Sequence, residues 1–253
     1  MISILFGLVL LFLILILYMF YEAHLNIVKK HEFSFSDIRL KKPLRIFFIS
    51  DIHRRKIHHS ILEKVNGKVD LVIIGGDLLE KGVPLQRINQ NIQKLRSLGP
   101  VYFVWGNNDK EINEQILLSI FQKWDVQVLK NSSTISNDRH NNWALIGVDD
   151  MNTGHIDLEG ALQEVKDIPF KILISHDPRV IKYVQREHKI SLILSGHTHG
   201  GQIRIVGFGP YEKGKTHIDN GITQIISNGY GTTAVPLRLD AKPETHYIII
   251  NSF

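Results

Sequence analysis

The sequence predicts one α/β domain that follows a single membrane-spanning helix. Three observations support this prediction. From residue 44 onward, short apolar runs typical of strands alternate with segments of helical periodicity. Five of the apolar runs end directly on Asp, Asn or His side chains. Residues 2–20 are almost entirely Ile, Leu, Val and Phe. We therefore expect a soluble domain whose chemistry lies at the carboxyl ends of its strands, tethered to a membrane.

The composition limits both the architecture and the chemistry. The chain has 253 residues, and the roughly 230 after the apolar segment suit one large domain with its own core. The absence of cysteine excludes thiol catalysis, disulfide bridges and cysteine-ligated metal. The formal net charge of +5 favours an anionic substrate or surface, although ordinary solubility accounts for it equally well.

The segment Ile2–Phe20 is long enough to cross a membrane as a helix. Its 19 residues, at the helical rise of 1.5 Å each, cover about 28 Å. No basic residue precedes the segment and no Ala-x-Ala site follows it, so we expect an uncleaved anchor over residues 1–21 rather than a signal peptide. Tyr18 and Tyr21 fit the aromatic belt of a membrane interface.

Basic side chains follow the anchor. By the positive-inside rule that side is cytoplasmic, so we expect a single-pass membrane protein whose domain faces the cytoplasm. The same charges would also hold the domain against anionic headgroups, or would simply belong to a solvated linker. These residues are Lys29, Lys30, Arg39, Lys41, Lys42 and Arg45.

After the anchor, we expect a short connecting segment followed by the domain, which begins at residue 43. Residues 22–42 are expected to be a linker or a first edge strand, and residues 43–253 to be the domain. A polar, hairpin-like stretch separates the fourth and fifth apolar runs. Strands are expected at 44–50, 70–74, 101–105, 126–129, 143–148, 170–174, 190–194, 223–227 and 245–251, and helices at 57–65, 84–98, 111–124, 157–165 and 180–187.

Hard metal ligands stand at the ends of five predicted strands. Because the carboxyl ends of strands line the ligand crevice of α/β sheets, we expect these side chains to meet. Each residue alone has a plain alternative as a polar loop side chain, but five such loops by chance are improbable. The five ends are Asp51-x-His53, Gly76-Asp77, Gly106-Asn107, Ser175-His176 and Gly196-His197-x-His199.

The candidate ligands combine carboxylates, imidazoles and one amide oxygen. This set suits Mn, Fe or Zn better than Ca. Seven ligands are too many for one tetrahedral ion, but they suit two divalent ions that share a bridging carboxylate. Two such ions can hold a bridging hydroxide and grip a phosphoryl group. The seven are Asp51, His53, Asp77, Asn107, His176, His197 and His199.

The ordered motifs resemble those of the calcineurin-like metallophosphoesterases, over residues 44–205. The Gly-His-Thr-His-Gly-Gly-Gln form behind an apolar N-terminus looks like the bacterial branch with membrane-associated phosphoesterases; some UDP-2,3-diacylglucosamine diphosphatases belong to the wider group. The resemblance implies a β-sandwich flanked by α-helices. It also implies a first metal on Asp51, His53, Asp77 and His199, and a second on Asp77, Asn107, His176 and His197, with Asp77 bridging.

One position departs from the family pattern. Where the family has Gly-Asn-His-Asp, this sequence has Asn108 in place of the histidine that protonates the leaving oxygen. An amide donates a hydrogen bond but delivers no proton, and general acid assistance is worth about 10²–10⁴-fold. We therefore expect a diphosphate or an activated ester as substrate. His58, His59 and His155 are candidates for a replacement acid.

Two further stretches are candidates for substrate contact. Arg54-Arg55-Lys56 follows the first metal motif, where cations suit a second phosphate or an anionic headgroup; the alternative is a basic surface turn. The apolar loop 206–211 is expected either to form a rim for an acyl chain or the membrane, or to pack over the end of the sheet.

These features predict a membrane-anchored, two-metal phosphodiesterase or diphosphatase. Asp77 and Asn108 are expected to take part in catalysis, and Arg54, Arg55 and Asn108 in substrate binding. The expected partners are a membrane-associated or nucleotide-type phosphate substrate and the lipids around the anchor. Nucleic acid is not expected, because no groove of aromatic and basic side chains is evident. A phosphomonoesterase, a phosphoprotein phosphatase and a membrane scaffold without catalysis remain alternatives.

Overall fold

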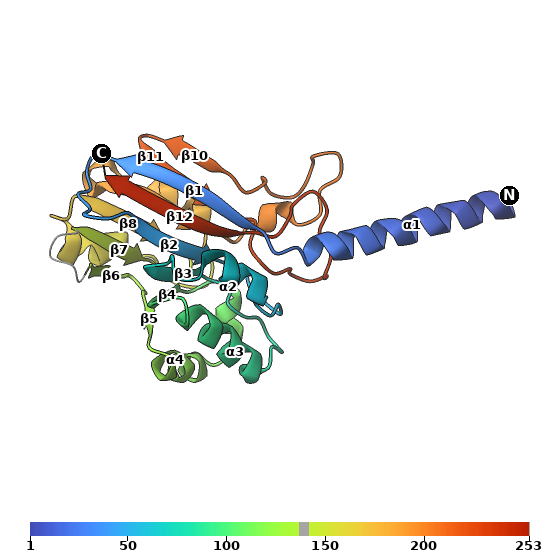
Figure 1. Cartoon of the computed structure of the whole chain (residues 1–253), viewed down its shortest axis with the longest axis horizontal. Helices are drawn as coiled ribbons and strands as arrows, with labels where there is room; N and C mark the ends of the chain where they lie inside the picture. The colour runs from blue at the N-terminus through green and yellow to red at the C-terminus, as the bar shows by residue number, and fades with distance from the viewer. Residues whose placement is uncertain (137–141, 253) are drawn as a thin grey trace.

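Two six-stranded sheets pack face to face in the computed structural model, which describes residues 1–136 and 142–252 (Figure 1). The predicted α/β class and the β-sandwich implied by the family resemblance are confirmed. In spatial order, the first sheet contains β1 (Val28–Phe35), β12 (Thr245–Ser252), β2 (Leu44–Ile49), β3 (Leu71–Gly75), β4 (Val101–Val104) and β5 (Val126–Val128). The second contains β10 (Thr216–Asp219), β11 (Ile222–Ile226), β9 (Ile190–Ser195), β8 (Phe170–Ile174), β7 (Trp143–Gly147) and β6 (Ser132–Ile135).

Each sheet is built around a block of four parallel strands. In the first sheet, β2 to β5 are parallel neighbours, β12 runs antiparallel to β2, and β1 runs parallel to β12. In the second sheet, β7, β8, β9 and β11 form the parallel block, and β6 and β10 close its edges antiparallel. Each parallel block directs the carboxyl ends of its strands to one edge, which is where the predicted ligands stand.

The inter-sheet core follows from the two-residue periodicity of the strands. In β2, Ile46 and Phe48 point between the sheets, whereas Phe47 and Ile49 point to the outer face. In β7, Leu145 faces the other sheet and its neighbour Ile146 faces outward. Both faces of these strands are buried, which explains why the sequence shows continuous apolar runs instead of an alternating pattern.

Helices cover the outer faces of both sheets. The first sheet is covered by α2 (His59–Val65), α3 (Leu85–Arg96) and α4 (Glu114–Lys123), which also connect its parallel strands in turn. The outer face of the second sheet packs on the short helix α5 (Leu158–Leu162) and on a 3₁₀ helix, Pro178–Tyr183. These layers leave the strand ends free to form a site.

Helix α1 (Ile2–Ala23) projects from one end of the sandwich (Figure 1). Its length and composition would let it cross a membrane, and almost all of its side chains are exposed in the isolated chain. Its last turns contact the domain, where Met19, Glu22 and Ala23 are buried and the Met19 carbonyl accepts a hydrogen bond from Arg238 N at 3.1 Å. Of the two expectations for residues 22–42, the edge strand is present as β1; the domain boundaries stay predictions.

Two predicted helices have different limits in the structure. The helix expected at 111–124 begins only at Glu114, because Ile112 is extended and the Asn113 side chain caps Gln115 N. The helix expected at 180–187 is not continuous. That segment contains two 3₁₀ helices, Pro178–Tyr183 and Arg186–His188, separated by extended backbone at Val184, which packs against the outer core. The polar stretch before β7 contains β6, and Asn137 and Asp138 lie outside the described residues.

The inter-sheet core makes a direct prediction about stability. Phe48 is fully buried, and its ring lies where a side chain at Gly75 would stand. We expect Phe48→Ala to lower the free energy of unfolding by about 3–5 kcal/mol, because it removes apolar burial and leaves a cavity. Denaturant unfolding of the full chain in detergent measures this change. Tyr183→Ala, at a side chain that is 56% exposed, is the control and is expected to change stability by about 0.5 kcal/mol or less. Equal effects of the two changes would contradict this packing.

Candidate metal centre

The predicted ligands come from the carboxyl ends of strands in both sheets. Strands β2, β3 and β4 deliver the first three motifs from one sheet, and β8 and β9 deliver the last two from the other. The loops are bonded to one another: Asp51 N donates to the Gly76 carbonyl at 3.0 Å, and His197 N donates to the Asp51 carboxylate at 3.1 Å. The site therefore straddles the two sheets at one end of the sandwich.

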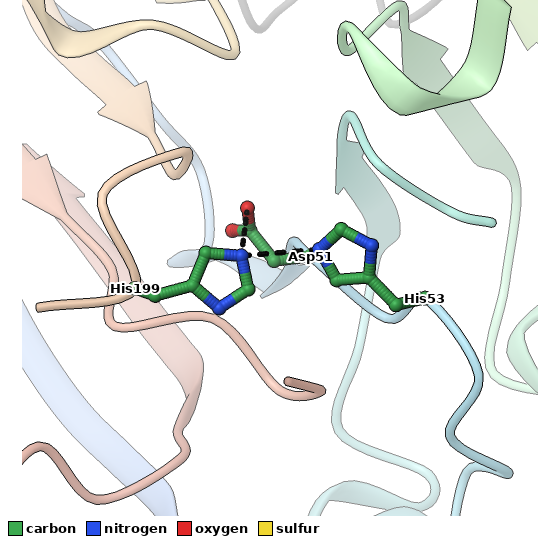
Figure 2. A group of neighbouring side chains, drawn as sticks. All are labelled: Asp51, His53 and His199. Carbon is green, nitrogen blue, oxygen red and sulfur yellow. Dashed lines mark hydrogen bonds and ion pairs between the residues drawn. The ribbon is translucent and has the colours of Figure 1, made fainter. Parts of the chain in front are cut away.

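The first group of ligands is Asp51, His53 and His199, all buried (Figure 2). Their ligand atoms lie within 4.8 Å of one another. The two Nε2 atoms of His53 and His199 are 3.0 Å apart, and His199 Nε2 is 3.4 Å from an Asp51 carboxylate oxygen. Two imidazole nitrogens this close can share a proton or a cation, so the group has the geometry and the chemistry of a cation site.

A second buried group consists of Asp51, Asp77 and His176. The carboxylate oxygen Oδ2 of Asp77 lies 3.4 Å from His176 Nε2 and 3.7 Å from His53 Nε2, so it stands between the two groups. His176 Nδ1 donates to the Gly75 carbonyl at 3.0 Å, which turns the Nε2 lone pair toward the site. One oxygen of Asp77 is thus close to histidine nitrogens of both groups.

His197 faces His176, and Asn107 lines the same pocket as His197. His197 Nδ1 lies 3.1 Å from His176 Nε2, a second pair of facing imidazole nitrogens. Within the described part of the chain, Asn107 Oδ1 is buried without a hydrogen-bond partner, because the amide nitrogen of Asn107 is the atom that bonds Asn108. An unsatisfied buried acceptor is costly unless something occupies it. The donor set therefore fits divalent cations.

Backbone strain is concentrated in these loops. A positive φ is uncommon for residues other than glycine and costs about 1–3 kcal/mol at each position. Five of the seven predicted ligands nevertheless adopt it, and such strain persists where a surrounding structure and a functional site demand it. They are Asp51 (53°), His53 (50°), Asp77 (50°), His197 (71°) and His199 (50°).

Glycines let the loops approach one another closely. A Cβ at Gly106 would lie 2.3 Å from the Asp77 carboxylate and 2.4 Å from the Asp77 backbone nitrogen. A Cβ at Gly196 would lie 2.3 Å from the Asp51 carboxylate. No side chain fits at these distances, so the two glycines of the sequence motifs are required by packing against the ligands.

Burial and neighbouring charges shift the pKa values of two histidines in the site in opposite directions. Burial would lower the pKa of His176, but the charge of Asp77 and the hydrogen bond with it outweigh burial and raise the pKa well above its ordinary value. Burial, reinforced by the nearby positive charges of His53 and Arg238, lowers the pKa of His199 well below its ordinary value. The charge of Asp77 thus favours the protonated form of His176, and a metal ion binding there would have to displace that proton.

Two acidic residues outside the predicted set support the ligands. Glu80 Oε2 lies 3.2 Å from His53 Nδ1, which orients that imidazole. Asp109 is fully buried and accepts hydrogen bonds from Asp77 N at 2.8 Å and Gly106 N at 2.9 Å. Burial and the charge of Asp77 raise the pKa of Asp109 to about 7. Asp109 is the last residue of the motif that the family has as Gly-Asn-His-Asp. Glu80 belongs to none of the motifs, and its only signal in the sequence is an acidic side chain three positions after Asp77.

Arg238 was not predicted as a site residue and is fully buried behind His199. Its guanidinium donates to the carbonyls of His199 at 3.1 Å and of Asn228 and Ala241 at 2.6 Å, and it lies 3.3 Å from His199 Nδ1. Burial lowers the pKa of Arg238 to about 10, so the group stays charged. It fixes the loop that carries His199. No spacing rule links it to the metal motifs, of which even the last lies about 40 residues earlier.

A pocket of about 400 Å³ opens above the ligands. Its lining combines site residues, including Asn108, with the apolar or aromatic side chains of Ile203, Pro210 and Tyr211. The replacement acids considered from the sequence do not line this pocket. His58 and His59 are exposed at the start of α2, and His155 lines a different cavity.

The structure gives the predicted substrate arginines other partners. Arg54 is 69% exposed and pairs with Glu80. Arg55 donates to the carbonyls of Tyr230 at 2.6 Å and Leu25 at 2.7 Å, and its guanidinium lies over the Tyr230 ring. Neither side chain lines the pocket, so substrate contact by these arginines stays a prediction without support from the geometry.

Fold and site together define a metallophosphoesterase. The model of the family described as calcineurin-like phosphoesterase matches residues 44–201, which is more than half of the sequence. The chain belongs to the calcineurin-like phosphoesterase family.

Three relatives and one solved structure are similar to the chain. YpbG of Bacillus subtilis (strain 168) is 47% identical over 92% of this chain and 90% of its own length. The phosphodiesterase YaeI of Escherichia coli (strain K12) is 26% identical over 80% of each chain. A transmembrane protein with metallophosphoesterase domain from Bos taurus is 29% identical over 83% of this chain and 53% of its own. A 5′-nucleotidase precursor from Thermus thermophilus shares the fold, with a TM-score of 0.53 and 12% identity over 83% of this chain and 54% of that one.

The close approach at Gly106 gives a test of the site without touching a ligand. We expect Gly106→Ala to displace the Asp77 carboxylate and to lower the affinity for divalent metal by at least about tenfold, as measured by calorimetry on the metal-stripped full chain. Gly99→Ala is the control, because a Cβ there makes only ordinary contacts, the nearest at 3.5 Å. Unchanged metal affinity in Gly106→Ala would show that Asp77 is not held as described.

Proposed function

We propose that the chain is a membrane-anchored phosphodiesterase or diphosphatase that uses two divalent metal ions, Mn, Zn or Fe. As a member of its family it is a hydrolase that acts on phosphoesters. One observation carries the finer proposal: the Asp77 carboxylate lies between two pairs of facing histidines, His53 with His199 and His176 with His197. This arrangement suits two cations that share one carboxylate.

The residues of the chain position the reacting groups. Two divalent cations, when bound, would lower the pKa of a water molecule and neutralise the charge on the phosphoryl oxygens. Asn108 N donates to Asp77 Oδ1 at 2.8 Å, which holds the shared carboxylate in place. The apolar side chains that line part of the pocket would displace water once a substrate fills it, and this would strengthen the electrostatic interactions at the phosphoryl group.

Asn108 supports a substrate with a good leaving group. Its side chain lines the pocket, and its amide is already oriented, because Oδ1 accepts from Asn107 at 2.9 Å and Nδ2 donates to Glu111 at 2.9 Å. An amide held this way can offer a hydrogen bond but no proton. We infer that the leaving group departs as a stable anion, as phosphate or an aryl oxide does, which favours a diphosphate or an activated diester.

The membrane location is part of this proposal. Helix α1 meets the length and hydropathy of a membrane span, and a relative from Bos taurus is named a transmembrane protein. The basic residues that follow α1 support a cytoplasmic position for the domain. Anionic substrates would be attracted to the net positive charge of +5.

The two pairs of facing histidines predict which metal ion each histidine variant loses. We expect His197→Ala to retain about one of two metal equivalents. The ion that His197 would bind is lost, whereas the group of Asp51, His53 and His199 stays intact and keeps its ion. His199→Ala is expected to retain the opposite ion. Elemental analysis after dialysis measures the ratio, with His59→Ala at an exposed histidine as the control. Full occupancy of both sites in His197→Ala would overturn the assignment.

A leaving-group series tests the reaction. We expect turnover of diphosphates and aryl phosphodiesters, and a fall of at least about 10²-fold on alkyl esters, because Asn108 delivers no proton. Asp77→Asn is expected to reduce the metal-dependent rate to background, while Asp125→Asn, at a surface carboxylate paired with Arg96, keeps full activity. Equal rates on alkyl and aryl esters would refute the leaving-group argument. Absence of turnover with every divalent metal tried would favour a scaffold.

A further inference from the structure

An apolar hairpin forms one rim of the pocket. We call residues 203–211 the rim hairpin. Its tip is a tight turn in which Ile205 N donates to the Phe208 carbonyl at 2.8 Å and Phe208 N donates to the Ile205 carbonyl at 3.0 Å. The two residues between them, Val206 and Gly207, both have positive φ, 51° and 81°. This is the geometry of a two-residue hairpin turn.

The tip displays large apolar side chains to solvent. Val206 is 89% exposed, Phe208 81% and Ile205 68%. A β-branched residue at positive φ is strained, and Asn, Asp or Gly would fit this position better. Neither packing within the domain nor backbone preference therefore explains valine at the tip. An exposed apolar group that costs strain indicates a partner outside the domain.

The rim hairpin is fixed to the pocket. Arg204 belongs to the hairpin, and its guanidinium donates to the carbonyls of Gly207 and Tyr211 within it and of Gly200 outside it, the last at 3.2 Å. The base of the hairpin therefore moves with the loop of His199. Because Ile203, Pro210 and Tyr211 line the pocket, anything that contacts the tip also lies at the mouth of the pocket.

The same hairpin is joined to the base of α1. The Gln202 side chain donates to the carbonyls of Thr233 at 2.9 Å and Val235 at 3.1 Å, and Val235 is itself 44% exposed. Three residues further on, Arg238 N donates to the Met19 carbonyl in the last turns of α1. Figure 1 shows the orange and red loops at the end of the sandwich from which α1 projects. The rim hairpin thus lies at the membrane end of the domain.

We propose that the rim hairpin inserts into the surface layer of the bilayer that α1 crosses, so that the pocket opens onto the membrane and accepts the phosphate group of an amphiphile held there. This inference rests on the membrane anchoring proposed above. We take the bilayer as the partner because α1 and the base of the hairpin are both hydrogen-bonded to residues 233–238. The hairpin therefore lies close to the bilayer that α1 crosses. Valine and phenylalanine at a hairpin tip suit the boundary between headgroups and acyl chains.

The first experiment measures insertion without using activity. The full chain is reconstituted into phosphatidylcholine–phosphatidylglycerol vesicles with plain or dibrominated acyl chains, and tryptophan quenching is compared with that of the unaltered chain, whose own tryptophans give the background. Three variants carry the probe: Phe208→Trp in the rim hairpin, Phe12→Trp in α1, and Ile116→Trp on α4, a matched control that is exposed on another part of the domain.

The expected result is strong quenching at positions 12 and 208 and weak quenching at position 116. Quenching at 12 but not at 208 would overturn the proposal while leaving the anchor in place. Quenching at none of the three would overturn both the anchor and the proposal. Quenching at 208 that disappears on dilution of protein in the vesicles would identify a second copy of the chain as the partner and overturn the proposal.

The second experiment separates docking from catalysis. Hexadecyl 4-nitrophenyl phosphate in vesicles and ethyl 4-nitrophenyl phosphate in solution share one leaving group, so they differ only in where the substrate is held. Val206→Asp with Phe208→Asp is expected to lower kcat/KM on the hexadecyl ester by about tenfold or more, and on the ethyl ester by less than about twofold. Neither residue lines the pocket. Ile116→Asp is the control.

The outcomes of the two experiments remain distinguishable. Equal losses on both esters would mean that the rim hairpin only supports the pocket, and unchanged activity on the hexadecyl ester would mean that it does not dock; each overturns the proposal. If the unaltered chain turned over neither ester, the proposed reaction would fail, and the quenching result would still decide the membrane contact by itself.

Discussion

The structure depends on the carboxylate of Asp77 being held between histidines that come from two different sheets. The charge is buried, so it requires positive or hydrogen-bonding neighbours on every side. His176 and the backbone nitrogen of Asn108 provide such neighbours, and they come from the loops that follow β8 and β4. The strained backbone of the ligands and the glycines at Gly106 and Gly196 are consequences of bringing so many groups into one buried volume.

This centre is mechanically connected to the N-terminal helix. Arg238 donates from its guanidinium to the loop of His199 and from its backbone nitrogen to Met19 of α1. Arg55 similarly ties the first metal loop to Leu25, just after the helix. The candidate metal centre and the base of α1 therefore lie at the same end of the sandwich.

Much of the site could be predicted because each ligand follows an apolar run. The motifs from Asp51 to His199 all stand at strand ends, and parallel pairing brings such ends together within each sheet, whereas the packing of the two sheets decides that both sets meet. The helix at 180–187 could not be predicted, since its end depends on Val184 packing against the outer core. The contacts of Arg54 and Arg55 could not be predicted either, because closeness in sequence to a metal motif does not determine the direction in which a long side chain points.

By itself, the sequence predicted the α/β class, the apolar N-terminal segment and the candidate metal ligands, because these depend on local apolar periodicity and on residue chemistry. Only the tertiary structure decided which histidines face each other, that Glu80 and Arg238 support them, and that residues 28–35 form an edge strand against β12. It alone placed the rim hairpin beside α1 at the mouth of the pocket. These are contacts between segments up to about 220 residues apart, and no local pattern encodes them.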